Sequence, residues 1–272
     1  MVAKIGVIRV HGNFSIVSGD PYALCQSIFG LPVTGLLRAG EAYNRYWNDQ
    51  KAARVVCFRA PMTCHNNIRL LCMRDTEEMR DWYRYLTTVT IFNAWDTAAH
   101  ALNGLDKDSD SCLLTDNPIL VENTREDPAI LCIQRRAEKR RVTQADLIQA
   151  NINSFGDEIG AITNRITSMF EVQARFAPGS EAYQTLDYRI KCGQLFQQNA
   201  IDKAKGILAK PMPKEWYSPS SLRCSEGDSP EQERRKAHLR ELLADKKPYF
   251  MCYLYPQERK RYRAYADHAN TK

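Results

Sequence analysis

The chain of 272 residues carries 38 Lys and Arg against 32 Asp and Glu, a formal net charge of +6 at pH 7. This length suits one large domain or two ordinary ones, and no run approaches the roughly 18 apolar residues of a membrane span. We also find no charged-then-apolar leader. Nine cysteines stand singly, without a Cys-x-x-Cys pair, which predicts reduced, mostly buried thiols and a cytoplasmic protein without membrane association.

Alternating and β-branched stretches make the first 125 residues rich in predicted strands. We predict strands at residues 4–10, 13–17, 54–58, 68–73, 87–92 and 112–114. Helical spacing predicts helices at 22–29, 36–47 and 77–86, the second in spite of Gly40. Asp116-Asn117-Pro118 closes the last strand as a turn, and Pro118 looks like a poor start for a helix.

The remainder of the chain is predicted to be helical. Thr143 and Asp146 resemble a helix cap, and residues 155–176 carry apolar residues at helical spacing. Ser180 can cap a long helix that runs to Ile201, and Ser229-Pro230 can open a charged helix to 244 after a linker at 218–229. A tail at 253–263 mixes aromatic and basic residues.

The most informative stretch is 103–110, where Asp106, Asp108 and Asp110 stand at every second position. Three carboxylates this close repel one another unless a cation neutralises them, and hard oxygen ligands suit Mg²⁺, Mn²⁺ or Ca²⁺. Asn103-Gly104 reads as a turn before them. We therefore expect a tight metal-binding loop between two extended segments.

Three interpretations of this loop remain open on the residues alone. It can be a solvated acidic turn. It can be a calcium loop, although Ser111 replaces the glycine of an EF-hand, Asn117 replaces its bidentate glutamate, and Pro118 is unsuited to the exiting helix. It can also be a catalytic Asp-x-Asp-x-Asp loop that holds Mg²⁺ for phosphoryl or nucleotidyl transfer.

Upstream of the loop, Arg59-Ala60-Pro61 is followed by His65 and Arg69. Arginine suits phosphate or ribose recognition because its planar guanidinium offers several fixed donors, so Arg59, His65 and Arg69 are candidate substrate-binding residues. The alternative is a plain surface loop in which Pro61 favours a turn.

Two basic clusters lie further along the chain. Residues 200–206 contain Lys203 and Lys205 ahead of Gly206, which can be a catalytic feature or simply the capped end of a helix. Residues 134–141 hold five Lys or Arg and one Glu. That run is either solvated or lies along a nucleic-acid backbone.

The order of these motifs resembles the catalytic double-psi β-barrel of RNA polymerases. In that family an Arg-Ala-Pro-type loop precedes an Asn-x-Asp-x-Asp-Gly-Asp-type loop. The later segments 159–164 and 200–206 are similar to helices after the barrel in eukaryotic-type RNA-dependent RNA polymerases and their single-chain phage and bacterial relatives. The resemblance spans about residues 55–206, and the Asp triad is its most specific part.

The resemblance implies a fold and a set of roles. The fold would be α+β, with the double-psi barrel in 1–125, a helical region in 126–215, and a linker, charged helix and tail in 216–272. The catalytic triad Asp106, Asp108 and Asp110 would hold one Mg²⁺, and a second Mg²⁺ would arrive with the nucleotide. Partners would be a nucleic acid template, nascent RNA and ribonucleoside triphosphates.

Further roles follow residue by residue. Arg59 would face the incoming nucleotide, for example at its ribose 2′-hydroxyl, together with Asn103, which sits one position further from the first aspartate than in the cellular enzymes. Lys203 and Lys205 would face the active centre or the nucleic-acid backbone.

Three features depart from the family pattern. Ser109 stands at the middle glycine of the loop, where serine strains a tight turn. Lys107 replaces a bulky apolar residue and would point to solvent or compete with the metal. These enzymes also use a second barrel, for which we find no room here. We therefore predict a partial polymerase chain or subunit; the alternatives are a catalytically impaired nucleic-acid-binding relative and a calcium-binding interaction module.

Overall fold

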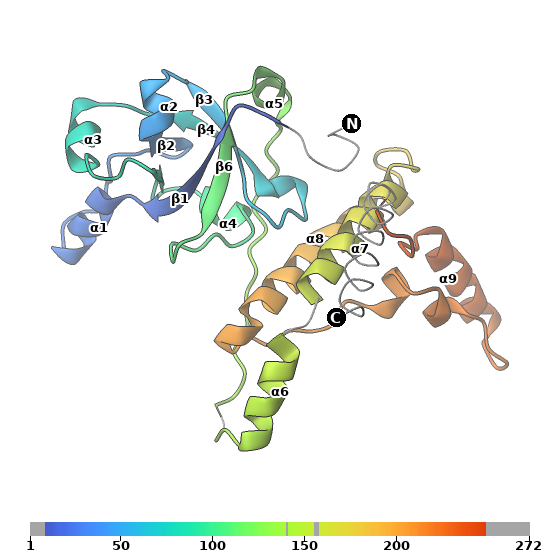
Figure 1. The fold of residues 1–272 in the computed structure, drawn as a ribbon. Helices are drawn as coiled ribbons and strands as arrows, with labels where there is room; N and C mark the ends of the chain where they lie inside the picture. The colour runs from blue at the N-terminus through green and yellow to red at the C-terminus, as the bar shows by residue number, and fades with distance from the viewer. Residues whose placement is uncertain (1–8, 140, 155–157, 249–272) are drawn as a thin grey trace, which may run out of the picture. The chain divides into compact units, whose positions relative to one another are not determined.

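The computed structural model describes residues 9–139, 141–154 and 158–248 (Figure 1). It forms two compact units, residues 10–133 on the one hand, and Arg9 with the described residues from Gln134 to Pro248 on the other. The first is a strand-rich unit with short helices, and the second is helical. Most of the strand predicted at 4–10, and the whole tail at 253–263, lie outside the described residues.

Six strands of the first unit close into a barrel with the order β1-β5-β2-β4-β3-β6. β1 pairs with β5 and β2 with β4 in parallel, and the other four pairs are antiparallel. Closure leaves no strand edge exposed. The strands are β1 (Asn13–Gly19), β2 (Glu41–Asn44), β3 (Arg54–Phe58), β4 (Ile68–Met73), β5 (Val89–Phe92) and β6 (Ser111–Thr115).

The barrel has an internal two-fold topology. If β1, β2 and β3 are exchanged with β4, β5 and β6, every neighbouring pair maps onto a neighbouring pair with the same direction. Two equivalent three-strand halves are thus interleaved around one core. The predicted α+β class is confirmed, with a closed barrel compatible with the double-psi type and a helical region after it.

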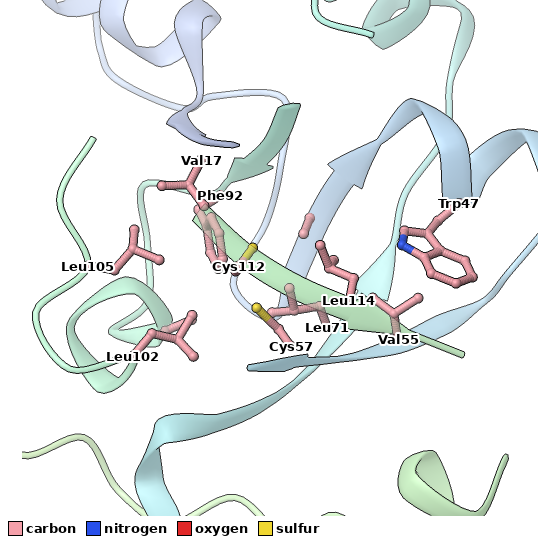
Figure 2. Packing of buried hydrophobic residues seen from close by; sticks show 12 residues of the cluster. Val17, Trp47, Val55, Cys57, Leu71, Phe92, Leu102, Leu105, Cys112 and Leu114 are labelled. Atoms are coloured by element: carbon pink, nitrogen blue, oxygen red, sulfur yellow. The ribbon is translucent and has the colours of Figure 1, made fainter. Parts of the chain in front are cut away.

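The barrel interior is mainly apolar because alternate side chains on each strand point inward. Figure 2 shows this cluster, in which Cys57 and Cys112 lie among aliphatic side chains and Phe92. The neighbouring thiol of Cys112, and then burial, raise the pKa of Cys57 well above its ordinary value. The Cys57 thiol is therefore protonated at neutral pH. Of the eight described cysteines, only Cys57, Cys64 and Cys112 are buried, fewer than predicted.

Four short helices join strands of the barrel, and a fifth follows the last strand: α1 (Pro21–Ile28), α2 (Arg45–Asp49), α3 (Glu77–Trp82), α4 (Ala98–Ala101) and, after β6, α5 (Pro118–Asn123). The buried Asp20 caps α1 and also accepts hydrogen bonds from Leu36 N (2.7 Å) and the Tyr83 hydroxyl (2.8 Å). Burial, and then Asp20, raise the pKa of Tyr83 far above its ordinary value, which keeps the phenol a donor to the carboxylate.

Two predictions for these connections are wrong. Residues 36–47 are not one helix but strand β2 followed by α2, because Gly40 has φ +82° and residues 41–44 pair with β4 and β5. Pro118 does begin a helix, because Asn117 caps it through hydrogen bonds from the N–H groups of Ile119 and Leu120. Proline at the first helical position lacks only an N–H that would have no helical partner.

The helical unit contains α6 (Gln144–Ser154), α7 (Glu158–Gln173), α8 (Glu181–Ile201) and α9 (Pro230–Glu241), with three short 3₁₀ turns at Asp202–Lys205, Lys214–Trp216 and Pro219–Leu222. The predicted caps Ser180 and Ser229 both accept helix N–H groups. Gly206 ends the turn after α8 at φ +81°. No helix in the described ranges has the length and apolarity to cross a membrane.

Helices α7 and α8 approach closely at Gly193, where an added Cβ would lie 2.6 Å from Ile166 Cγ1. Glycine-to-alanine changes in helices ordinarily stabilise by about 0.5–1 kcal/mol. We expect Gly193→Ala instead to lower the free energy of unfolding by about 1–3 kcal/mol, because Ile166 is fully buried and cannot move away.

Gly160→Ala on α7 is the matched control, since its added Cβ would meet no described atom within 4 Å beyond its chain neighbours and the backbone of its own helix. Gly160→Ala should raise the free energy of unfolding, as glycine-to-alanine changes in helices ordinarily do. Urea denaturation of both variants measures the difference, and equal effects would show that Ile166 can move aside to make room at Gly193.

Candidate active site

The Asp loop joins α4 to β6 at one end of the barrel. It opens on a turn in which Asn103 and Gly104 both have positive φ, +57° and +63°, as expected for an Asn-Gly pair. It ends at Asp110, whose carbonyl accepts a hydrogen bond from Val17 N of β1 (3.0 Å). The predicted turn is present, but a helix rather than an extended segment precedes it.

Arg59, directly after β3, reaches across to this loop. Its guanidinium donates to the carbonyls of Leu102 (3.3 Å) and Asn103 (3.0 Å) and to Asp110 Oδ2 (2.7 Å). The Arg59 side chain is 11% exposed and that of Asp110 is 24% exposed, so the ion pair is largely withdrawn from water. The structure thus brings the Arg-Ala-Pro loop and the Asp loop into contact.

Two asparagine amides also tie these loops together. The buried Asn103 donates from Nδ2 to the carbonyl of Pro61 (3.0 Å), next to the cis peptide between Ala60 and Pro61. Asn67 accepts the N–H groups of Thr63 and Cys64 and donates to the carbonyl of Ala101 (2.7 Å). Asn103 therefore positions the loop, and its predicted contact with a nucleotide stays a prediction.

Asn67, which is fully buried in this structure, is not among the residues predicted from the sequence. A signal was available, because an asparagine that follows Thr63-Cys64 within a loop is well placed to bond backbone N–H groups nearby. Its bond to α4 could not be foreseen, since it joins residues 34 positions apart.

The three aspartates do not lie together around one point. Asp106 and Asp108 are exposed, whereas Asp110 is partly buried and accepts from Arg59 and from the N–H of Asp106 (2.7 Å). Within the described residues, no group of three His, Cys, Asp or Glu side chains is gathered closely enough to hold a metal ion. The oxygen donors suit Mg²⁺ chemically, but as they lie here they do not form its site, because the guanidinium of Arg59 neutralises Asp110.

The two unusual residues of the loop have defined conformations. Ser109 has φ +104°, a backbone conformation that favours glycine. Lys107 lies against β1, with Cδ, Cε and Nζ within 3.2–3.4 Å of where a Cβ would stand on Gly19. Lys107 therefore packs over the end of β1.

Ser109→Gly is expected to raise the free energy of unfolding by about 1 kcal/mol, since it removes the strain of a side chain at positive φ. Ser109→Ala is the control, because it keeps the Cβ and should leave the strain in place. Thermal denaturation measures both. A loss of stability in Ser109→Gly would mean that the serine hydroxyl makes a stabilising contact that outweighs the strain.

The remaining candidate residues have other surroundings. Arg69 on β4 is 8% exposed on its side chain; it donates to the carbonyl of Asp127 (2.7 Å) and lies 3.7 Å from Glu126. It therefore anchors the segment after α5. His65 is exposed on the 3₁₀ turn His65–Asn67. Their predicted contacts with substrate stay predictions.

Lys203 and Lys205 belong to the helical unit, on the 3₁₀ turn that follows α8. Lys203 Nζ lies 3.3 Å from Glu158 Oε2, and Lys205 Nζ lies 3.3 Å from Asp202 Oδ1. All these side chains except that of Asp202 are at least 45% exposed, so the pairs are weak. The predicted approach of both lysines to the Asp loop stays a prediction.

Comparison with known proteins gives a fold-level likeness only. No family model matches the chain, and no curated protein matches it in sequence. Among solved structures, the chain is similar to the RNA-dependent RNA polymerase QDE-1 from Thielavia terrestris, with a TM-score of 0.47 and 13% identity. The match covers 73% of this chain and 23% of that one, so the chain spans less than a quarter of that polymerase. At this identity and TM-score the match assigns no activity.

Proposed function

We propose that the chain is the catalytic barrel, with adjoining helices, of a nucleotidyltransferase of the RNA polymerase type. It would act as part of a longer polymerase or with a second barrel supplied by another chain. Ribonucleoside triphosphates would be its substrates, and template and nascent RNA its partners.

The observation that supports this proposal is the contact between Arg59 and Asp110, which are 51 residues apart. The resemblance implies one site made from the Arg-Ala-Pro loop and the Asp loop. A solvated acidic turn would not require an arginine on another loop to bond two of its carbonyls and a carboxylate. The helix that starts at Pro118 removes one objection to the calcium-loop alternative. The glycine and the bidentate glutamate of an EF-hand are nevertheless replaced by Ser111 and Asn117.

Arg59 has a definite role in this proposal. It holds the two ends of the Asp loop together, because it bonds Leu102 and Asn103 at the start and Asp110 at the end. For Asp106, Asp108 and Asp110 to hold Mg²⁺, Asp110 must exchange the guanidinium for the ion. Arg59 would then be free to donate to an oxygen of the incoming nucleotide.

The test is incorporation of labelled ribonucleotides on primed RNA and DNA templates, with a second polymerase barrel supplied as a separate chain, and with and without Mg²⁺ or Mn²⁺. We expect incorporation that depends on the divalent ion. Salt-dependent RNA binding without incorporation would instead favour the catalytically impaired relative. Calcium binding at micromolar concentration without RNA binding would favour the interaction module.

A further inference from the structure

Two basic segments that are far apart in the sequence lie side by side in the helical unit. Arg136 pairs with Ile207 in an antiparallel bridge. Leu208 N donates to the carbonyl of Arg135 (2.8 Å), and Ala137 N donates to the carbonyl of Gly206 (2.9 Å). This short ladder, residues 135–137 against 206–208, places the run at 134–141 next to the lysines around Gly206.

Exposed basic side chains outnumber acidic ones on and around the ladder among the described residues. Its exposed bases, on the ladder and within three residues of it, are Arg135, Arg136, Lys139, Lys203, Lys205 and Lys210. Nearby acids partly neutralise the lysines, since Glu158 pairs with Lys203 and Asp202 pairs with Lys205. Asp202 is also engaged by Gln134 Nε2 (2.5 Å).

Arg135 and Arg136, unlike these lysines, are not neutralised by nearby acids of the described chain. Within the described residues neither Arg135 nor Arg136 has an ion-pair partner, and both are exposed. Neighbouring residues of a strand point to opposite faces, so each face of the ladder carries one guanidinium. The main-chain bonds hold the ladder, which leaves both side chains available for a ligand.

We propose that this basic ladder binds the phosphate backbone of RNA. The proposal extends the proposed function by naming the surface that holds the nucleic acid, and it rests on that function for the choice of partner. Arginine is suited to it because the planar guanidinium bonds two phosphate oxygens at once. Such contacts release counterions and make binding salt-dependent, without reading sequence.

The test uses the full chain and a fluorescein-labelled single-stranded RNA, with anisotropy measured between about 50 and 200 mM salt. Arg135→Gln with Arg136→Gln should weaken binding at least about 10-fold. It should also reduce the slope of log K against log salt by about 1.4, which is about 0.7 for each phosphate that the protein no longer neutralises. Both substitutions are at exposed side chains of a main-chain ladder, so thermal stability should not change.

Arg234→Gln with Arg235→Gln on α9 is the control, a second pair of adjacent exposed arginines in the same unit, of which Arg235 lies 4.0 Å from Glu215. It should bind RNA like the unsubstituted protein. Equal weakening in both pairs would show a general effect of charge and would overturn the proposal, as would an unchanged affinity in the ladder variant. Incorporation is not needed for this assay. A protein that binds RNA through the ladder but incorporates nothing would refute only the proposed function.

Discussion

Nucleotide incorporation is expected to fall at least about 100-fold, equivalent to about 2.7 kcal/mol in the transition state, when Asp108 is replaced by asparagine. Asp108 is the middle carboxylate of the loop and is exposed. The change removes one charge while keeping the shape of the side chain. Exposed substitutions ordinarily alter stability by no more than about 0.5 kcal/mol, so the loss would report on chemistry rather than on folding.

Asp116→Asn provides the matched control in the same incorporation assay. Asp110 precedes β6 and Asp116 follows it, so Asp116 lies at the opposite end of that strand from the Asp loop, where it pairs with His11 (2.9 Å). It should leave incorporation unchanged. Comparable losses in the two variants would contradict the assignment of the active site to the Asp loop.

Replacing Asn67 by alanine should lower the free energy of unfolding by about 3 kcal/mol. The substitution would leave the buried N–H groups of Thr63 and Cys64, and the carbonyl of Ala101, without their present partner. Each unsatisfied buried group costs about 1–3 kcal/mol. Because Asn67 ties the Arg59 loop to α4, we also expect incorporation to fall.

The control for this change is Asn123→Ala at the end of α5. Asn123 is exposed, and its side chain donates to the carbonyl of Ile119 within its own helix (2.8 Å). The substitution should change stability by less than about 0.5 kcal/mol. Chemical denaturation separates the cases, and a similarly small effect at Asn67 would mean that water replaces the amide there.

Local signals in the sequence were enough to predict much of the fold. Strands β1, β3, β4, β5 and β6 coincide with β-branched or alternating stretches, and Ser180 and Ser229 begin the helices that they were predicted to cap. These features depend on residues within a few positions of one another. For that reason they can be read without knowledge of the tertiary structure.

The segment at 36–47 is one that local signals predict incorrectly. Its aromatic residues recur at helical spacing, yet Tyr43 is fully buried on a strand that pairs with β5. Pairing with strands elsewhere in the chain outweighs the local pattern there. The contact of Asn67 with α4 was missed for the same reason, because its partner is distant in the sequence.

The sequence predicted candidate residues for the site, and their roles stay predictions. The order of motifs placed Arg59 and the Asp loop in one proposed site. It did not indicate that Arg59 would bond Asp110 directly, or that Ser109 would take a conformation with φ +104°. A guanidinium and a divalent cation are competing partners for one carboxylate, and the sequence does not show which of them Asp110 contacts.

Whether the Asp loop holds one divalent ion can be decided by titrating the protein with Mn²⁺ and following free Mn²⁺ by electron paramagnetic resonance. We predict one site on the unsubstituted chain that is lost, or weakened at least about 10-fold, in Asp106→Asn, Asp108→Asn and Asp110→Asn, and retained in Asp116→Asn. Mn²⁺ binding that is unchanged in all three loop variants would refute the proposed metal site and the nucleotidyl transfer that depends on it.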